Sequence, residues 1–149
     1  MDIALARTLH LLGVVVWVGG MFFANFALRP SVTALPPPQR LPLLVATLGR
    51  FMAWAGAAVI AVVASGFWLV GVSGGMAGVS ASVHAMMGVG IAMAAVYLYV
   101  IAVPFRAMRA AVARADWPAG GAAMARVRLL VAINLALGLV TVVLGAYAR

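Results

Sequence analysis

The chain has 149 residues, of which 67% are hydrophobic and 8% are charged, and its mean hydropathy is +1.20. A soluble domain needs far more polar surface than this, so the composition predicts an integral membrane protein. The net charge is +8 and no cysteine is present. The arginines lie at the ends of apolar runs, which indicates topology signals and no nucleic-acid partner, and the missing cysteine excludes disulfides, iron–sulfur clusters and thiolate metal sites.

Four apolar runs are long enough to cross a bilayer as helices. They are predicted at about residues 7–28, 51–72, 83–105 and 129–148. The first run is too long for the hydrophobic region of a signal peptide, so we expect a retained helix. Because the runs show no strand-like alternation, they exclude a membrane barrel. We therefore predict an all-α fold, with residues 1–149 forming a single transmembrane domain built as a four-helix bundle.

The connections between the spans differ in charge. The first carries arginines and the run Pro36-Pro37-Pro38, which forces an extended or turning segment, and the apolar residues 41–49 after it can lengthen the second helix. The second, Gly71 to Ser82, has no charge. In the third, arginines surround Asp116, which is expected to cap the fourth helix. The excess of arginine predicts that the first and third connections are cytoplasmic and that both termini are periplasmic.

The chain has two histidines, His10 and His84, and each lies near the start of a span. Ionisable residues inside hydrocarbon are costly and tend to mark function. Leu9-His10 precedes Gly13-Val14, and Val83-His84 precedes Gly88-Val89, which suggests two hairpins related by an axis along the membrane normal. Such an axis would place the two imidazoles opposite each other, where they would hold a haem iron or a copper ion.

Other residues recur at helical spacing on the same face as each histidine. In the first span these are Gly13, Trp17 and Gly20, and in the third they are Met87, Gly88 and Ile91. The glycines would leave room for a flat macrocycle. Arg7 lies one turn outward from the first histidine, where it would pair with a haem propionate, as would the serines Ser80 and Ser82.

Two alternatives to haem stay open. Met76, Met86 and Met87 lie near the same end as His84, and thioethers with imidazole suit Cu(I). In the other alternative the chain is a cofactor-free membrane module whose small residues mediate homo-oligomer contacts. The glycines expected to form those contacts are Gly13, Gly20, Gly138 and Gly145.

Two asparagines fall in the cytoplasmic half of the spans, Asn25 in the first and Asn134 in the fourth. Hydrogen bonds between helices are the favoured interpretation, because buried polar groups usually find partners. The alternative is that they line a quinone or substrate pocket beside Arg29 and Arg50.

Short motifs along essentially the whole chain resemble those of the CopD family of bacterial membrane proteins. They are Leu9-His10-Leu11-Leu12, Trp17-Val18-Gly19-Gly20-Met21-Phe22-Phe23, Arg29-Pro30, Arg50-Phe51, Val83-His84-Ala85-Met86, Asp116-Trp117-Pro118 and Asn134-Leu135. The resemblance implies a short, single-module form in the bacterial inner membrane, with a role in copper uptake or periplasmic copper handling.

The layout is also similar, more distantly, to the HemJ-type protoporphyrinogen oxidases, which are regarded as haem b proteins. His10, His84 and Asn134 match the histidines and asparagine of that pattern. Met86 stands where that family typically has a lysine, and Leu135 stands where it has an acid. Both departures argue against the same oxidase chemistry, while the resemblance still implies that the two histidines bind haem b.

The leading hypothesis is therefore a cytochrome b-like inner-membrane protein in which His10 and His84 hold one haem b near the periplasmic face. Ligation by two imidazoles leaves no open iron position, which favours electron transfer between the quinone pool and a periplasmic redox partner. The sequence leaves open whether the chain is a membrane oxidoreductase. The alternative is copper binding or transport by the two histidines with Met87.

Overall fold

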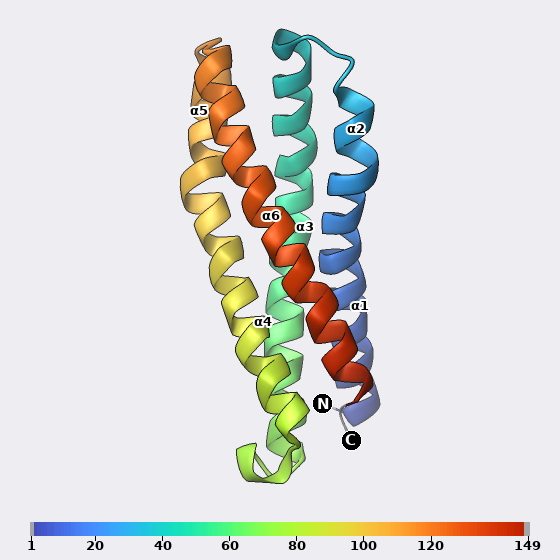
Figure 1. The fold of residues 1–149 in the computed structure, drawn as a ribbon. Helices are drawn as coiled ribbons and strands as arrows, with labels where there is room; N and C mark the ends of the chain where they lie inside the picture. Colours follow the sequence, from blue (N-terminus) through green and yellow to red (C-terminus); the bar gives the residue numbers. More distant parts are fainter. Residues whose placement is uncertain (1, 148–149) are drawn as a thin grey trace.

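The computed structural model describes residues 2–147, and in these residues it contains helices and no strand. Four helical segments are long and apolar enough to cross a membrane. They are Ile3–Val32, Pro37–Val72, Ala81–Ala113 and Trp117–Ala146. Figure 1 shows the four segments side by side, with successive segments running in opposite directions. This arrangement confirms the predicted all-α membrane bundle.

The first and third segments are each interrupted by a π-helical stretch. The elements in chain order are α1 (Ile3–Phe23), the π-helix η1 (Ala24–Leu28), α2 (Arg29–Val32), α3 (Pro37–Val72), the 3₁₀ turn η2 (Met76–Gly78), α4 (Ala81–Val100), the π-helix η3 (Ile101–Phe105), α5 (Arg106–Ala113) and α6 (Trp117–Ala146). Proline has no backbone N–H and cannot make the bond to the fourth residue before it. Pro30 lies just after η1 and Pro104 lies inside η3, so both π-helical stretches have a local cause.

The helices extend beyond the apolar spans read from the sequence. Hydropathy marks the part of a helix that lies in hydrocarbon, whereas the helix itself continues until its backbone groups find a cap. At the start of α6 the side chain of Asp116 accepts a hydrogen bond of 3.1 Å from the Ala119 N–H, which confirms the predicted cap. Pro36 is extended and α3 begins at Pro37, so this helix includes the apolar residues 41–49. Residue 148, the predicted end of the fourth span, lies outside the described residues.

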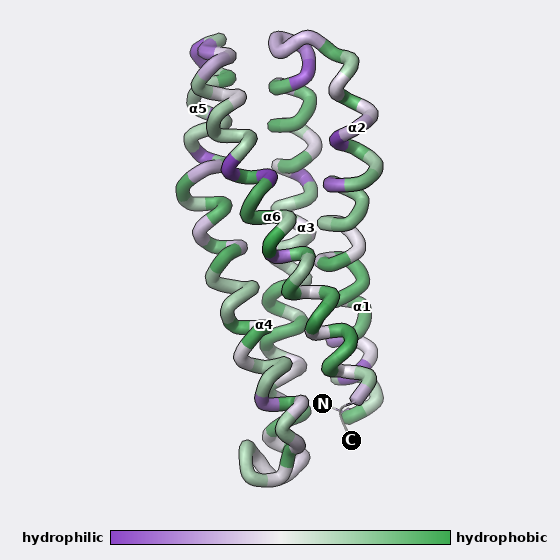
Figure 2. Tube along the Cα trace, viewed as in Figure 1, coloured by the Kyte–Doolittle hydropathy of each residue, from purple (hydrophilic) through white to green (hydrophobic). Residues whose placement is uncertain are grey.

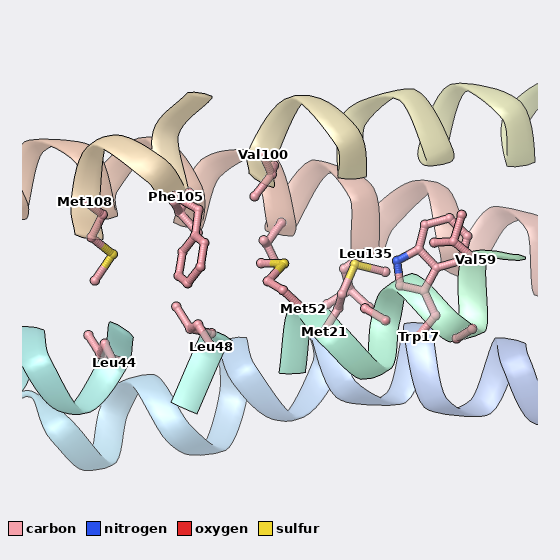
Figure 3. Packing of buried hydrophobic residues seen from close by; sticks show 14 of the residues in the cluster. Trp17, Met21, Leu44, Leu48, Met52, Val59, Val100, Phe105, Met108 and Leu135 are labelled. Atoms are coloured by element: carbon pink, nitrogen blue, oxygen red, sulfur yellow. The ribbon is translucent and has the colours of Figure 1, made fainter. Parts of the chain in front are cut away.

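The helices pair within each half of the chain. α1 packs along α3, α4 packs along α6, and α6 crosses toward α1 (Figure 1). A continuous cluster of buried apolar residues fills the space between the four segments, and Figure 3 shows part of it. This cluster includes Trp17, Met21, Leu48, Met52, Val100, Phe105, Met108 and Leu135.

The two ends of the bundle differ in polarity. α1 and α4 begin, and α3 and α6 end, at the same end of the molecule (Figure 1). We call this the histidine end, because His10 and His84 lie on its helices. The segments 33–36 and 114–116 lie at the opposite end, which we call the arginine end, where hydrophilic residues gather (Figure 2).

Candidate functional site

His10 lies on α1 and is half-buried against α3. Its Nδ1 atom is 3.1 Å from the carbonyl oxygen of Val62 and 3.1 Å from Oγ of Ser65. A carbonyl oxygen can only accept, so the hydrogen bond to Val62 requires the proton to be on Nδ1. In the neutral ring this leaves the lone pair on Nε2, which is the atom that a metal needs.

Ser65 holds this arrangement in place from within α3. It is only 2% exposed, and its hydroxyl donates within its own helix to the Ala61 carbonyl at 2.5 Å. Because that hydroxyl proton is used, its oxygen remains an acceptor facing the histidine. Two acceptors on α3 therefore face the Nδ1–H of His10.

His84 has a related arrangement at the start of α4. It is exposed, and its Nδ1 lies 2.9 Å from the carbonyl oxygen of Ser80, one turn earlier. The same reasoning places the proton on Nδ1 and the lone pair on Nε2. The Ser80 and Ser82 hydroxyls lie 2.9 Å apart, and Ser82 donates to the Tyr147 carbonyl at 3.3 Å, which ties the start of α4 to the end of α6.

The two histidines thus lie on the helices of the histidine end, each bonded within its own half of the chain. Between residues 2 and 147, no hydrogen bond joins the two rings and none engages either Nε2 atom. Metal-ligating histidines usually donate their other ring N–H to a carbonyl or carboxylate, which fixes the ring and raises its basicity. His10 and His84 both show that arrangement.

The glycines on the His10 face have a different role from the expected one. A Cβ added at Gly13 would lie 2.6 Å from Val62 Cγ2 and 3.1 Å from the Ala58 carbonyl oxygen, and one added at Gly20 would collide with the Phe51 ring. These two glycines therefore allow close approach of α3, which fills the space expected for a macrocycle. At Gly88 on α4 an added Cβ would meet nothing within 4 Å.

Other residues expected at the site lie in several environments. Trp17 is 3% exposed, and its ring meets that of Tyr97 edge-on with centroids 6.4 Å apart. Met87 is half-buried, while Arg7 and Met76 are exposed. Trp17 therefore belongs to the bundle core, and Arg7 and Met87 lie toward the histidine end.

Three of the four glycines expected at an oligomer interface, Gly13, Gly20 and Gly138, pack closely against the same chain. Gly13 and Gly20 face α3, as described above. A Cβ added at Gly138 would lie 2.9 Å from Val18 Cγ2, and one added at Gly145 would lie 3.6 Å from Met86 Sδ. Gly13, Gly20 and Gly138 therefore allow close packing within one bundle, whereas Gly145 is exposed and an added Cβ there would make only an ordinary contact.

Two residues that position other groups, Ser65 and Tyr97, were not predicted from the sequence. Ser65 holds His10, and Tyr97 donates from α4 to the Met52 carbonyl on α3 at 2.8 Å. Ser65 is the one hydroxyl residue among residues 51–72, which was an available signal. The contact made by Tyr97 depends on which helices are neighbours, and no local pattern reports that.

A small cavity of about 10 Å³ lies deeper in the bundle. Its lining residues are Trp17, Met21, Phe51, Met52, Ala55, Tyr97, Val100, Leu130, Val131 and Asn134. Asn134 is 3% exposed, and its Oδ1 is the one buried side-chain nitrogen or oxygen atom within residues 2–147 that has no hydrogen-bond partner. The partner expected for this amide oxygen on a neighbouring helix is therefore not found.

Asn25 lies elsewhere, toward the arginine end. Its side chain donates to the carbonyl of Met21 on its own helix at 3.0 Å. With Arg29 and Arg128 it lines a second cavity of about 20 Å³. The two asparagines thus line separate cavities, and both cavities are too small for a quinone ring.

Comparison with known protein families gives one match. Residues 45–148 match the family described as Copper resistance protein D. No match was found among curated proteins or among solved structures. The matched region contains most of α3 and all of α4, α5 and α6, and so includes Ser65, His84 and Asn134, whereas His10 lies before it.

Proposed function

The chain belongs to the copper resistance protein D family, and from this premise we propose that it binds copper at the histidine end. It is a multi-pass protein of the inner membrane with four membrane-spanning segments. In this proposal the ligands are the Nε2 atoms of His10 and His84, with the thioether of Met87 as a third donor. The main support is that both histidines have Nδ1 bonded to a carbonyl oxygen, which leaves Nε2 as the lone-pair atom.

The donor set favours the reduced ion, Cu(I). Soft thioether and imidazole ligands suit Cu(I), whereas harder metals prefer carboxylates. Within residues 2–147, no group of three or more histidine, cysteine, aspartate or glutamate side chains is placed to hold a metal. Copper binding here therefore depends on two imidazoles and a thioether. Met87 lies three residues after His84, on the same side of α4.

The test is Cu(I) binding by detergent-purified protein, measured in competition with a chromophoric Cu(I) chelator. We expect His10→Gln and His84→Gln each to weaken binding at least tenfold, with a larger loss in the double variant. Thr8→Ala is the matched control, because Thr8 is exposed on α1 near His10 and its hydroxyl bonds to its own helix. Unchanged Cu(I) affinity in the double variant would refute the proposal.

Haem b is the second candidate, because an axial histidine has the same arrangement, with Nδ1 donating to a backbone carbonyl and Nε2 free for iron. His10 and His84 supply the required donors, and Arg7 is exposed near the same end, where it can meet a propionate. A Cβ added at Gly88 would meet no atom within 4 Å, whereas one added at Gly13 would meet Val62 on α3. When bound, haem b would supply one-electron transfer, here between the quinone pool and a periplasmic partner.

One sample distinguishes the two candidates. Protein purified from haem-sufficient cells is measured for its absorption spectrum and its metal content together. A Soret band that disappears in both single histidine variants, with copper at background, would establish haem and refute the copper proposal. Bound copper without a Soret band would refute the haem candidate.

A further inference from the structure

The observation that carries a further inference is the unpaired oxygen of Asn134 in the middle of the bundle. The residue lies on α6 and is 3% exposed. Its Oδ1 is buried without a partner, the one such side-chain atom in the described part of the chain, residues 2–147. An unpaired buried acceptor is costly, so a native protein that keeps one usually has a ligand or water for it.

Two methionines line the cavity together with Asn134. Met21 on α1 and Met52 on α3 both line it, and they are 2% and 5% exposed. Figure 3 shows both side chains directed into the space between the helices. Tyr97 also lines the cavity, but its hydroxyl proton is donated to the Met52 carbonyl and does not serve Asn134.

The volume and lining of the cavity restrict which ligand it can hold. Its volume of about 10 Å³ corresponds to a single water-sized sphere, which excludes a quinone, a haem or an amino acid. A buried water needs two to four polar partners. The lining is otherwise mainly apolar, and its polar or sulfur-bearing side chains are those of Asn134, Trp17, Tyr97, Met21 and Met52. The two thioethers beside an unpaired amide oxygen are a donor set that suits a soft monovalent cation.

We propose that Met21, Met52 and Asn134 form a Cu(I) site inside the bundle, distinct from the histidine end. The two thioethers and the amide oxygen are its ligands, and the Trp17 ring contributes a cation–π contact. This proposal rests on the proposed copper function and adds a second binding position to it. Met21 follows His10 by eleven residues on one helix, so the two positions are about 16 Å apart along the axis, near half the thickness of the hydrocarbon core.

The experiment counts Cu(I) per chain by chelator titration of the full-length protein in detergent. We expect two Cu(I) for the native sequence and one for the double variant Met21→Leu with Met52→Leu. Leucine has nearly the volume of methionine, so these substitutions keep the packing. Met93→Leu is the matched control, because Met93 is buried on α4 at 2% exposure and does not line the cavity. This control is expected to keep two Cu(I).

A second measurement identifies the ligands. In the His10→Gln, His84→Gln protein we expect one remaining Cu(I), with sulfur neighbours in its X-ray absorption spectrum. Adding Met21→Leu and Met52→Leu to that protein should remove this ion. Asn134→Leu should weaken binding of the same ion at least tenfold. Circular dichroism spectra matching that of the native protein check that each variant is folded.

The possible failures are distinct. One Cu(I) per native chain that is unaffected by the two leucine substitutions would overturn this inference and leave copper at the histidine end. Retention of two Cu(I) after both histidine substitutions would refute the histidine site and not this one. A single ordered water in the cavity, with no copper bound there, would also overturn the inference.

Discussion

The lone pair on Nε2 of His10 depends on the groups around Nδ1. Two acceptors on α3 face this atom, the Val62 carbonyl and the Ser65 hydroxyl, each at 3.1 Å. The carbonyl alone fixes the tautomer, whereas the hydroxyl adds a second contact that restricts rotation of the ring. Orientation of the ring thus depends on a side chain from another helix.

We therefore predict that Ser65→Ala weakens Cu(I) binding at the histidine end by about tenfold, the lower part of the range for losing such an outer partner. Chelator competition measures the loss. Ser73→Ala is the control, because Ser73 makes a similar bond to the Leu69 carbonyl at the end of the same helix and is exposed. Equal Cu(I) affinity in both variants would contradict the prediction.

A second residue-scale prediction concerns Tyr97, which joins the two halves of the bundle through the Met52 carbonyl at 2.8 Å. Tyr97→Phe keeps the ring that meets Trp17 edge-on but removes this bond. The expected loss in free energy of unfolding is about 0.6 kcal/mol, the average for hydrogen bonds between membrane helices. Tyr99→Phe, at a site 53% exposed, should leave stability unchanged. Denaturant unfolding in mixed micelles compares the stability of the two variants. An equal loss in both would argue that the hydrogen bond from Tyr97 to Met52 does not stabilise the bundle.

At the scale of elements, the α1–α3 contact depends on small residues at defined positions. Gly13 lies under Val62, whereas Gly19, on the same helix, has nothing within 4 Å of an added Cβ. The two glycines therefore differ only in what faces them.

We predict that Gly13→Ala lowers the free energy of unfolding by about 1–3 kcal/mol, because the methyl group overpacks the interface. Gly19→Ala should be neutral or slightly stabilising, since alanine favours a helix by up to about 1 kcal/mol over glycine. Thermal unfolding in detergent gives the comparison. A destabilised Gly19→Ala with an unchanged Gly13→Ala would mean that α1 presents another face to α3.

The positions of the helices could be predicted from the sequence, whereas the contacts between helices could not. Apolar runs gave four spans, and the position of Asp116 gave the start of α6. The face shared by His10 and Gly13 was also recognised, but what packs on that face depends on which helix lies beside α1. For that reason the sequence predicts a macrocycle in the space beside Gly13, whereas in the structure the side chain of Val62 on α3 occupies that space. The role of both histidines in binding stays a prediction.

At the scale of the whole molecule, charge is distributed unequally between the two ends. The arginines of the first and third connections gather at the arginine end, and the uncharged turn between α3 and α4 lies at the histidine end (Figure 2). The up-and-down course of the helices brings both connections to the same end, because an even number of segments separates them (Figure 1). This distribution of arginine favours insertion of the bundle in one orientation, with the arginine end on the cytoplasmic side.

The last prediction is that the arginine end faces the cytoplasm and the histidine end the periplasm. The chain has no cysteine, so Ala77→Cys and Ala34→Cys each create a single thiol, the first at the histidine end and the second at the arginine end, both at exposed positions. A membrane-impermeant maleimide applied to spheroplasts should label the first variant and label the second only after lysis. The reverse pattern would place His10 and His84 at the cytoplasmic surface, and copper would then reach them from inside the cell.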